Sequence, residues 1–212
     1  SANCLGERGR AVVALPHDAA SSEVVAAGYE YAASLSVSAL VDYEDGGIAL
    51  NDASLGLLHQ VWRARILENL ETEQTEIWID AEGVDAFLWR AADDITEVSI
   101  AFDQNMRLHI AWVENGEAFF YWYDTNVSNH VTTNYGGAVI TPRITMDDKR
   151  PLQIQRNDII LAYLKAGDLR YRQQRDRYTI ERVIEADVNS PGLIKVGMSK
   201  ALRLQFMLQN PS

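Results

Sequence analysis

The chain lacks the features of a disulfide-stabilised, zinc-bound or membrane-spanning protein. Its single cysteine, Cys4, cannot form an internal disulfide and cannot build a cysteine zinc cluster. The apolar run AVVAL at 11–15 is too short for the core of a signal peptide or for a membrane span. We therefore expect no membrane span and no disulfide framework.

Motifs of enzymatic chemistry are also missing. The sequence contains no P-loop, GxGxxG, GxSxG or HExxH string. The histidines, which show no spacing typical of metal ligands, are His17, His59, His109 and His130. The acidic pairs at 93–94 and 147–148 are more typical of turns than of glycosidase carboxylates. We predict that the protein is not an enzyme and has no catalytic residues, no metal and no cofactor.

Basic residues are scarce in most of the chain, which carries a net charge of −11. Residues 1–139 hold 22 acidic and six basic residues, whereas residues 140–212 hold eight acidic and 13 basic residues. Fifteen of the 19 basic residues are arginine, whose planar guanidinium binds carboxylates and stacks on aromatic rings. The acidic balance argues against a nucleic-acid partner. The split predicts contacts between the acidic and basic parts, either between copies of the chain or with neighbouring subunits.

Helical periodicity is scarce as well. A candidate helix at 21–35 is interrupted by Gly28. The segment 55–70 fits a helix or a strand, and its alternating, β-branched and aromatic centre favours a strand. From residue 95 onward short apolar runs alternate with turns, and the Asn115-Gly116 pair is the strongest hairpin signal. This pattern predicts antiparallel hairpins.

A repeated unit is the most informative feature of the sequence. The segment 159–174 matches 108–123 at a constant offset of 51, and a shorter copy at 196–208 aligns with 100–112. A single meander cannot bury both of its faces, so the copies must stack on one another or on another element.

We therefore predict an all-β protein of repeated antiparallel meanders, either propeller-like or a β-sandwich. Residues 1–33 are expected to form an N-terminal segment with a short helix and a strand near 10–15 that could close a ring. Residues 34–212 are expected to form the repeated β-meander domain. Its copies lie near 95–135, 142–186 and 193–212.

Alternation along the strands assigns side chains to faces. Trp112, Tyr163 and Leu208 fall on equivalent core positions. The third strand carries aromatic rings in one copy and arginines in the other, which predicts a contact face that binds carboxylates or rings of a partner. Its residues are Phe119, Tyr121, Tyr123, Arg170 and Arg172, and Arg175 and Arg177 extend the arginine strip. The alternatives are that both strand faces are buried, or that the arginines only solubilise an edge strand.

Three segments resemble a family of virion structural proteins of tailed bacteriophages, which are tail or tail-tip components. These segments are 48–66, 95–116 and 160–184. The resemblance implies a non-enzymatic part of the virion tail that is made in the host cytoplasm. It also implies contacts with other tail subunits and a homo-oligomer in the particle. The alternative function is a carbohydrate-binding module that recognises a host-surface glycan through the aromatic residues at 118–123.

Overall fold

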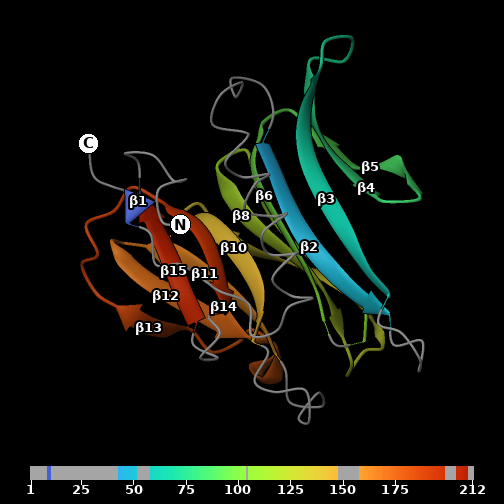
Figure 1. Ribbon diagram of the computed structural model, residues 1–212. Helices are drawn as coiled ribbons and strands as arrows, with labels where there is room; N and C mark the ends of the chain where they lie inside the picture. The colour runs from blue at the N-terminus through green and yellow to red at the C-terminus, as the bar shows by residue number, and fades with distance from the viewer. Residues whose placement is uncertain are drawn as a thin grey trace.

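The strands form four antiparallel sheets that follow one another along the chain (Figure 1). The computed structural model describes residues 9–10, 43–51, 58–103, 105–147, 158–198 and 204–209. The first sheet contains β2 (Tyr43–Asn51), β3 (Leu58–Asn69), β4 (Gln74–Ala81) and β5 (Val84–Ala92). The second contains β6 (Ile95–Phe102), β7 (Leu108–Glu114), β8 (Glu117–Asp124) and β9 (Asn129–Gly136).

The third sheet contains β10 (Val139–Asp147), β11 (Asp158–Lys165), β12 (Asp168–Gln173) and β13 (Arg182–Glu185), with the 3₁₀ turn η3 (Gln174–Asp176) after β12. The fourth contains β14 (Leu193–Met198), β15 (Leu204–Gln209) and β1 (Gly9–Arg10). The all-β prediction and the repeated meanders are thereby confirmed.

Tight turns connect the middle strands of the meanders. Asn115 and Gly116 both adopt positive φ, at 51° and 74°, as a two-residue hairpin of the predicted kind requires. Ala166 and Gly167 do the same at the equivalent turn, with φ of 53° and 83°. The same turn chemistry therefore produces the same meander in the second and third sheets.

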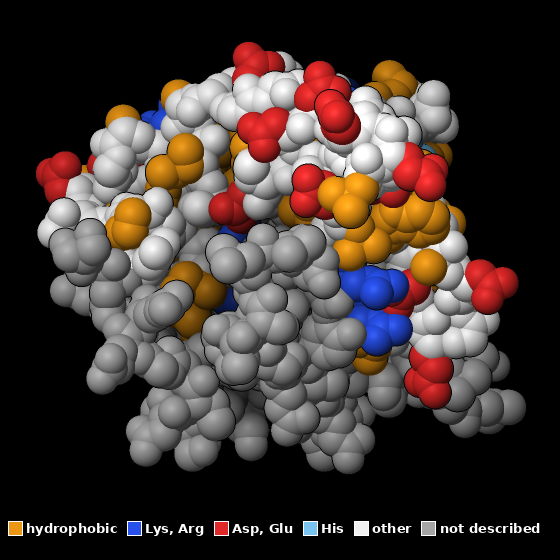
Figure 2. All heavy atoms as spheres, turned by 90° about the horizontal axis from the view of Figure 1, so that it is seen from above, with side chains coloured by type: hydrophobic (Ala, Val, Ile, Leu, Met, Phe, Trp, Pro, Cys, Tyr) orange, Lys and Arg blue, Asp and Glu red, His pale blue; other side chains and the backbone are white. Residues whose placement is uncertain are grey.

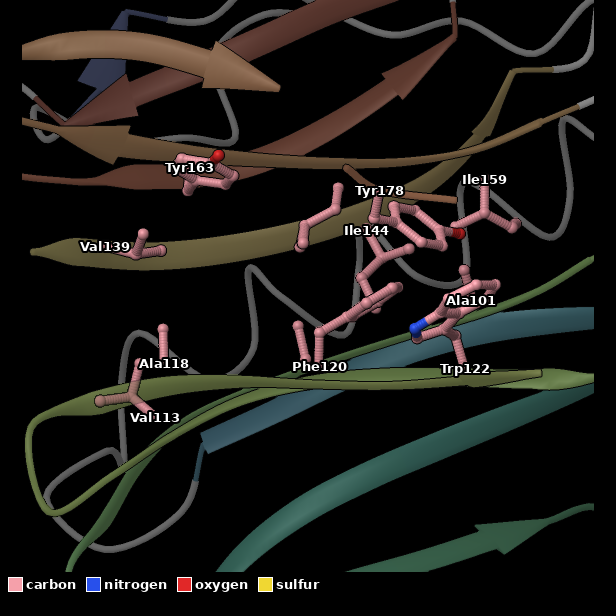
Figure 3. Packing of buried hydrophobic residues seen from close by; sticks show 12 residues of the cluster. Ala101, Val113, Ala118, Phe120, Trp122, Val139, Ile144, Ile159, Tyr163 and Tyr178 are labelled. Carbon is pink, nitrogen blue, oxygen red and sulfur yellow. The ribbon is translucent and has the colours of Figure 1, made fainter. Parts of the chain in front are cut away.

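The sheets stack in series, and each neighbouring pair shares its own apolar layer. One layer joins the first and second sheets, a second joins the second and third, and a third joins the third and fourth. Figure 3 shows the middle layer, where Phe120 and Trp122 of β8 face Ile144, Ile159 and Tyr178. Each sheet thus shares an apolar layer with the sheet before or after it along the chain.

Neighbouring sheets meet most closely at their first strands, where one side chain bridges each junction. Asp45 Oδ1 of β2 accepts a hydrogen bond from the backbone N–H of Ile100 in β6, at 3.4 Å. Ser99 Oγ of β6 accepts one from Ile144 N in β10, at 3.1 Å. Thr141 Oγ1 of β10 continues the series by accepting from the first residue of β14, at 2.8 Å. Each first strand is thus fixed to the next.

The last sheet is also tied to the first and to the N-terminal part of the chain. Lys195 Nζ of β14 lies 2.8 Å from Asp45 Oδ2 of β2. β1 pairs antiparallel with β15, with Arg10 opposite Leu208. An N-terminal strand that completes the last sheet is the role expected of the closing segment; its continuation at 11–15 and the candidate helix at 21–35 lie outside the described residues.

The segment 55–70 is a strand over its described part, as predicted, because β3 runs from residue 58 to residue 69. The sequence analysis did not single out the meander at 43–92 as a copy, yet it forms a complete four-stranded sheet. Trp112 and Tyr163 are fully buried as predicted, whereas Leu208 of the fourth sheet is only partly buried at the apolar layer shared with the third sheet. Both faces of β7 and β11 are buried between neighbouring sheets.

The approach of β2 to β6 predicts a strong effect at Gly47. A β-carbon at this position would lie 3.2 Å from the backbone oxygen of Ile100, so a side chain would push the two strands apart. We expect Gly47→Ala to lower the free energy of unfolding by about 1–3 kcal/mol in urea titrations. Gly46→Ala is the control, because its β-carbon would make an ordinary 3.6 Å contact with Trp62. Equal stability of the two variants would contradict the close junction.

Trp112 offers a second test of the stacked core. Its ring packs edge-on against Trp89 of the first sheet and stacks on Phe119, with centroid distances of 5.0 and 5.2 Å. We expect Trp112→Ala to cost about 3–5 kcal/mol of unfolding free energy, because it empties a large buried site. Leu208→Ala should cost less, because Leu208 is only partly buried. A urea midpoint that barely moves for Trp112→Ala would show that the layer is not formed.

Candidate contact face

The predicted contact residues occupy one equivalent face of two sheets. In the second sheet Phe119 lies opposite Trp112 and Tyr121 lies opposite Ile110. In the third sheet Arg170 lies opposite Tyr163, and the next arginine of β12 lies opposite Leu161. Each set points toward the preceding sheet, so the two sets lie in different interfaces of the same molecule.

The aromatic set is half-buried, and its rings already have partners. Phe119 stacks on Trp112 with an angle of 16° between the planes. Tyr121 stacks on His130 at a centroid distance of 4.6 Å and an angle of 2°. Tyr123 lies edge-on to His130. The rings therefore fill the outer part of the interface with the first sheet. The alternative in which both faces of this strand are buried describes them in part.

The arginine set binds a carboxylate of its own chain. Glu181, which precedes β13, accepts hydrogen bonds from Arg170 at 2.5 Å and from Arg172 at 3.1 Å. Tyr163 Oη donates to the same carboxylate at 2.6 Å, and Lys165 Nζ lies 3.1 Å away. The positive charge expected to meet a partner is thus used to hold the outer strand of the third sheet against its neighbours.

The pKa of Glu181 reflects the donors that surround its carboxylate. Partial burial disfavours the charged form, but hydrogen bonds from Tyr163, Arg170 and Lys165 outweigh burial and lower the pKa of Glu181 to about 2. The pKa of the Tyr163 hydroxyl is raised, because burial and its hydrogen bond to the carboxylate both oppose ionisation. Four donors from β11 and β12 surround this one carboxylate, which makes Glu181 the centre of a polar cluster of the third sheet.

The connection from β12 to β13 continues the same role. Arg175 pairs with Asp158 of its own sheet, and Arg177 pairs with Asp124 of the second sheet. Tyr178 is fully buried between these sheets, where its ring packs edge-on against Phe120 at 4.6 Å (Figure 3). The arginine strip therefore clamps the third sheet onto the second.

Asp103 and His109 have structural roles in the second sheet. Asp103 Oδ1 accepts hydrogen bonds from the backbone N–H groups of Asn105 and Arg107, which closes the turn between β6 and β7. His109 is completely buried, and its Nδ1 lies 3.2 Å from the hydroxyl of Tyr178. Burial lowers the pKa of His109, so the imidazole is held neutral in the core.

Sequence reasoning missed Arg107, which differs from the other cations. Among residues with described side chains, every other lysine and arginine forms an ion pair with a carboxylate, whereas Arg107 forms none. Its guanidinium lies 3.8 Å from the ring centroid of Tyr123. His130, beside this ring, has a buried Nδ1 without a hydrogen-bond partner. The one available signal was an arginine directly after the Asp103 turn, which is not specific.

No family model, curated protein or solved structure matches the chain. No helix among the described residues is long and apolar enough to cross a membrane. The same residues contain no group of three or more histidine, cysteine, aspartate or glutamate side chains arranged to hold a metal ion. The role of the chain therefore has to be inferred from its surfaces and its sequence.

Glu181 gives the clamp a defined acid sensitivity. Its folded pKa of about 2 lies below the ordinary value of 4.5, so the unfolded chain binds the proton more readily between these values. We expect the stabilisation from this carboxylate to be complete above pH 4.5 and to disappear as the pH falls toward 2. Glu181→Gln should flatten the dependence of unfolding free energy on pH in this window, whereas Glu185→Gln, at an exposed glutamate, should leave it unchanged. Identical profiles for parent and Glu181→Gln would contradict this role.

Proposed function

We propose that the chain is a structural component of a tailed-phage virion, located in the tail or tail tip, that acts by contacts with other tail subunits and with copies of itself and has no enzymatic activity. The resemblance of 48–66, 95–116 and 160–184 to that family motivates the proposal. The observation that supports a contact role is the row of exposed apolar side chains on the outer strands.

These apolar side chains lie on and beside β5 and β13, at the outer edges of the first and third sheets. They are Phe87, Leu88, Ile180, Val183 and Ile184, each between 38% and 51% exposed. Seen from above, a hydrophobic patch and a few basic side chains lie close together among scattered acidic groups (Figure 2). Several exposed apolar side chains on outer strands are the kind of surface that protein interfaces use.

A carbohydrate-binding module is the second candidate. Stacking of a sugar needs an open aromatic face, and Phe119, Tyr121 and Tyr123 are only half-buried. Neighbouring rings or a guanidinium already cover one face of each. A glycan array with the purified chain separates the two candidates, because strong binding that Tyr121→Ala abolishes would favour the module.

The contact role is tested by incorporation into particles. We expect mass spectrometry of purified virions to find the chain, and we expect Phe87→Ser with Leu88→Ser to lower its incorporation at least several-fold without shifting its urea midpoint. Leu70→Ser is the control, because Leu70 is also exposed but lies in the turn between β3 and β4, away from the outer strand. Virions that lack the parent chain would refute the proposal.

Arg170 and Arg172 are less suitable for such a test. Because both arginines bind Glu181, their replacement by glutamate would place like charges together and destabilise the third sheet itself. Loss of assembly by that double variant would therefore not separate a lost contact from a lost fold.

A further inference from the structure

We propose that Arg107, held on Tyr123 and beside His130, is a binding site for a carboxylate side chain of a partner protein. The inference rests on the proposed role in protein contacts and assigns one surface to it. Arg107 follows the β6–β7 turn, Tyr123 lies near the end of β8, and His130 lies near the start of β9. The three residues meet at one end of the second sheet.

The guanidinium of Arg107 is positioned but unsatisfied. It lies over the Tyr123 ring, and none of its N–H groups has an acceptor among the described residues. The nearest acidic residue in the turn cannot serve. Asp103 Oδ1 accepts from two backbone N–H groups, and Asp103 Oδ2 accepts from Gln174 and lies 3.6 Å from His109. A planar fork with free donors fits a carboxylate.

His130 packs beside the site, with its ring stacked on Tyr121 and edge-on to Tyr123. Its Nδ1 is buried and has no hydrogen-bond partner, so this atom influences the site without touching a bound side chain. Burial and then the charge of Arg107 lower the pKa of His130, while the charge of Asp103 opposes them. A bound carboxylate would offset the charge of Arg107 and should raise the pKa of His130.

The surroundings favour a protein side chain over an acidic sugar. Arg107 occupies one face of the Tyr123 ring, and His130 occupies one face of the Tyr121 ring, so little aromatic surface is open for a pyranose. Met106 beside the arginine is 41% exposed and adds an apolar rim. Arginine, tyrosine and methionine together are the residue types enriched in protein interfaces.

The test is a titration of the full-length chain with the peptide acetyl-Gly-Glu-Gly-Glu-Gly-amide, followed by NMR of arginine Nε–H and histidine ring signals. We expect saturable shifts at Arg107 and a rise in the pKa of His130. Arg107→Gln should weaken binding at least tenfold, and Arg107→Lys, which keeps the charge but loses the fork, should weaken it less. Arg182→Gln is the control, because Arg182 is paired with Asp176 and should not affect binding.

Several results would overturn the site. Binding that is unchanged in Arg107→Gln would show that the guanidinium does not bind the carboxylate. Tighter binding of trigalacturonate than of the peptide would point to an acidic glycan, and equal binding of inorganic phosphate would show an unspecific anion contact. If Arg107→Gln alters the urea midpoint, the peptide affinity of Arg107→Lys decides whether the guanidinium is required. Detection of the chain in virions is independent of all these outcomes, so the site and the proposed function can fail separately.

Discussion

The arrangement of the molecule depends on how the first strand of each sheet satisfies the buried edge of the next. β6 and β10 each pair with a following strand on one side, which leaves backbone N–H groups on the other side facing the interior. Asp45 and Ser99 supply the missing acceptors from the preceding sheet. These bonds are short-range and directional, so they constrain the distance between the sheets at their first strands.

Farther from these strands, the two inner interfaces fill equivalent space with different chemistry. Between the first and second sheets, β8 presents stacked aromatic rings, and Arg90 pairs with Glu114 across the gap. Between the second and third sheets, β12 presents arginines that gather around Glu181. Burying the arginine cluster around Glu181 costs more desolvation free energy than burying aromatic rings. Hydrogen bonds offset this cost, because four donors share one carboxylate and each cation of the cluster is paired.

Local signals explain why much of the fold could be predicted. The Asn115-Gly116 turn and the alternation on either side of it act within a few residues, and they define the second sheet and its repeat in the third. The first sheet has weaker turn signals, and its 12-residue β3 begins within a helix-like pattern, so its membership of the series emerges only from stacking. The partners of the arginines could not be predicted from the sequence for a different reason. Arg177 meets Asp124 from 53 positions away, a pairing that only the packing of two sheets determines.

The pairing of the basic side chains also determines which charges are left exposed on the surface. Where side chains are described, lysines and arginines other than Arg107 are paired with carboxylates inside or between sheets, and these include the described arginines of residues 140–212. The exposed charge that Figure 2 displays is mostly acidic. Two such surfaces repel at low ionic strength, so long-range attraction between copies is weak. In the proposed contact role, association would therefore draw on short-range apolar contact at the outer strands and on Arg107, which has no carboxylate partner among the described residues.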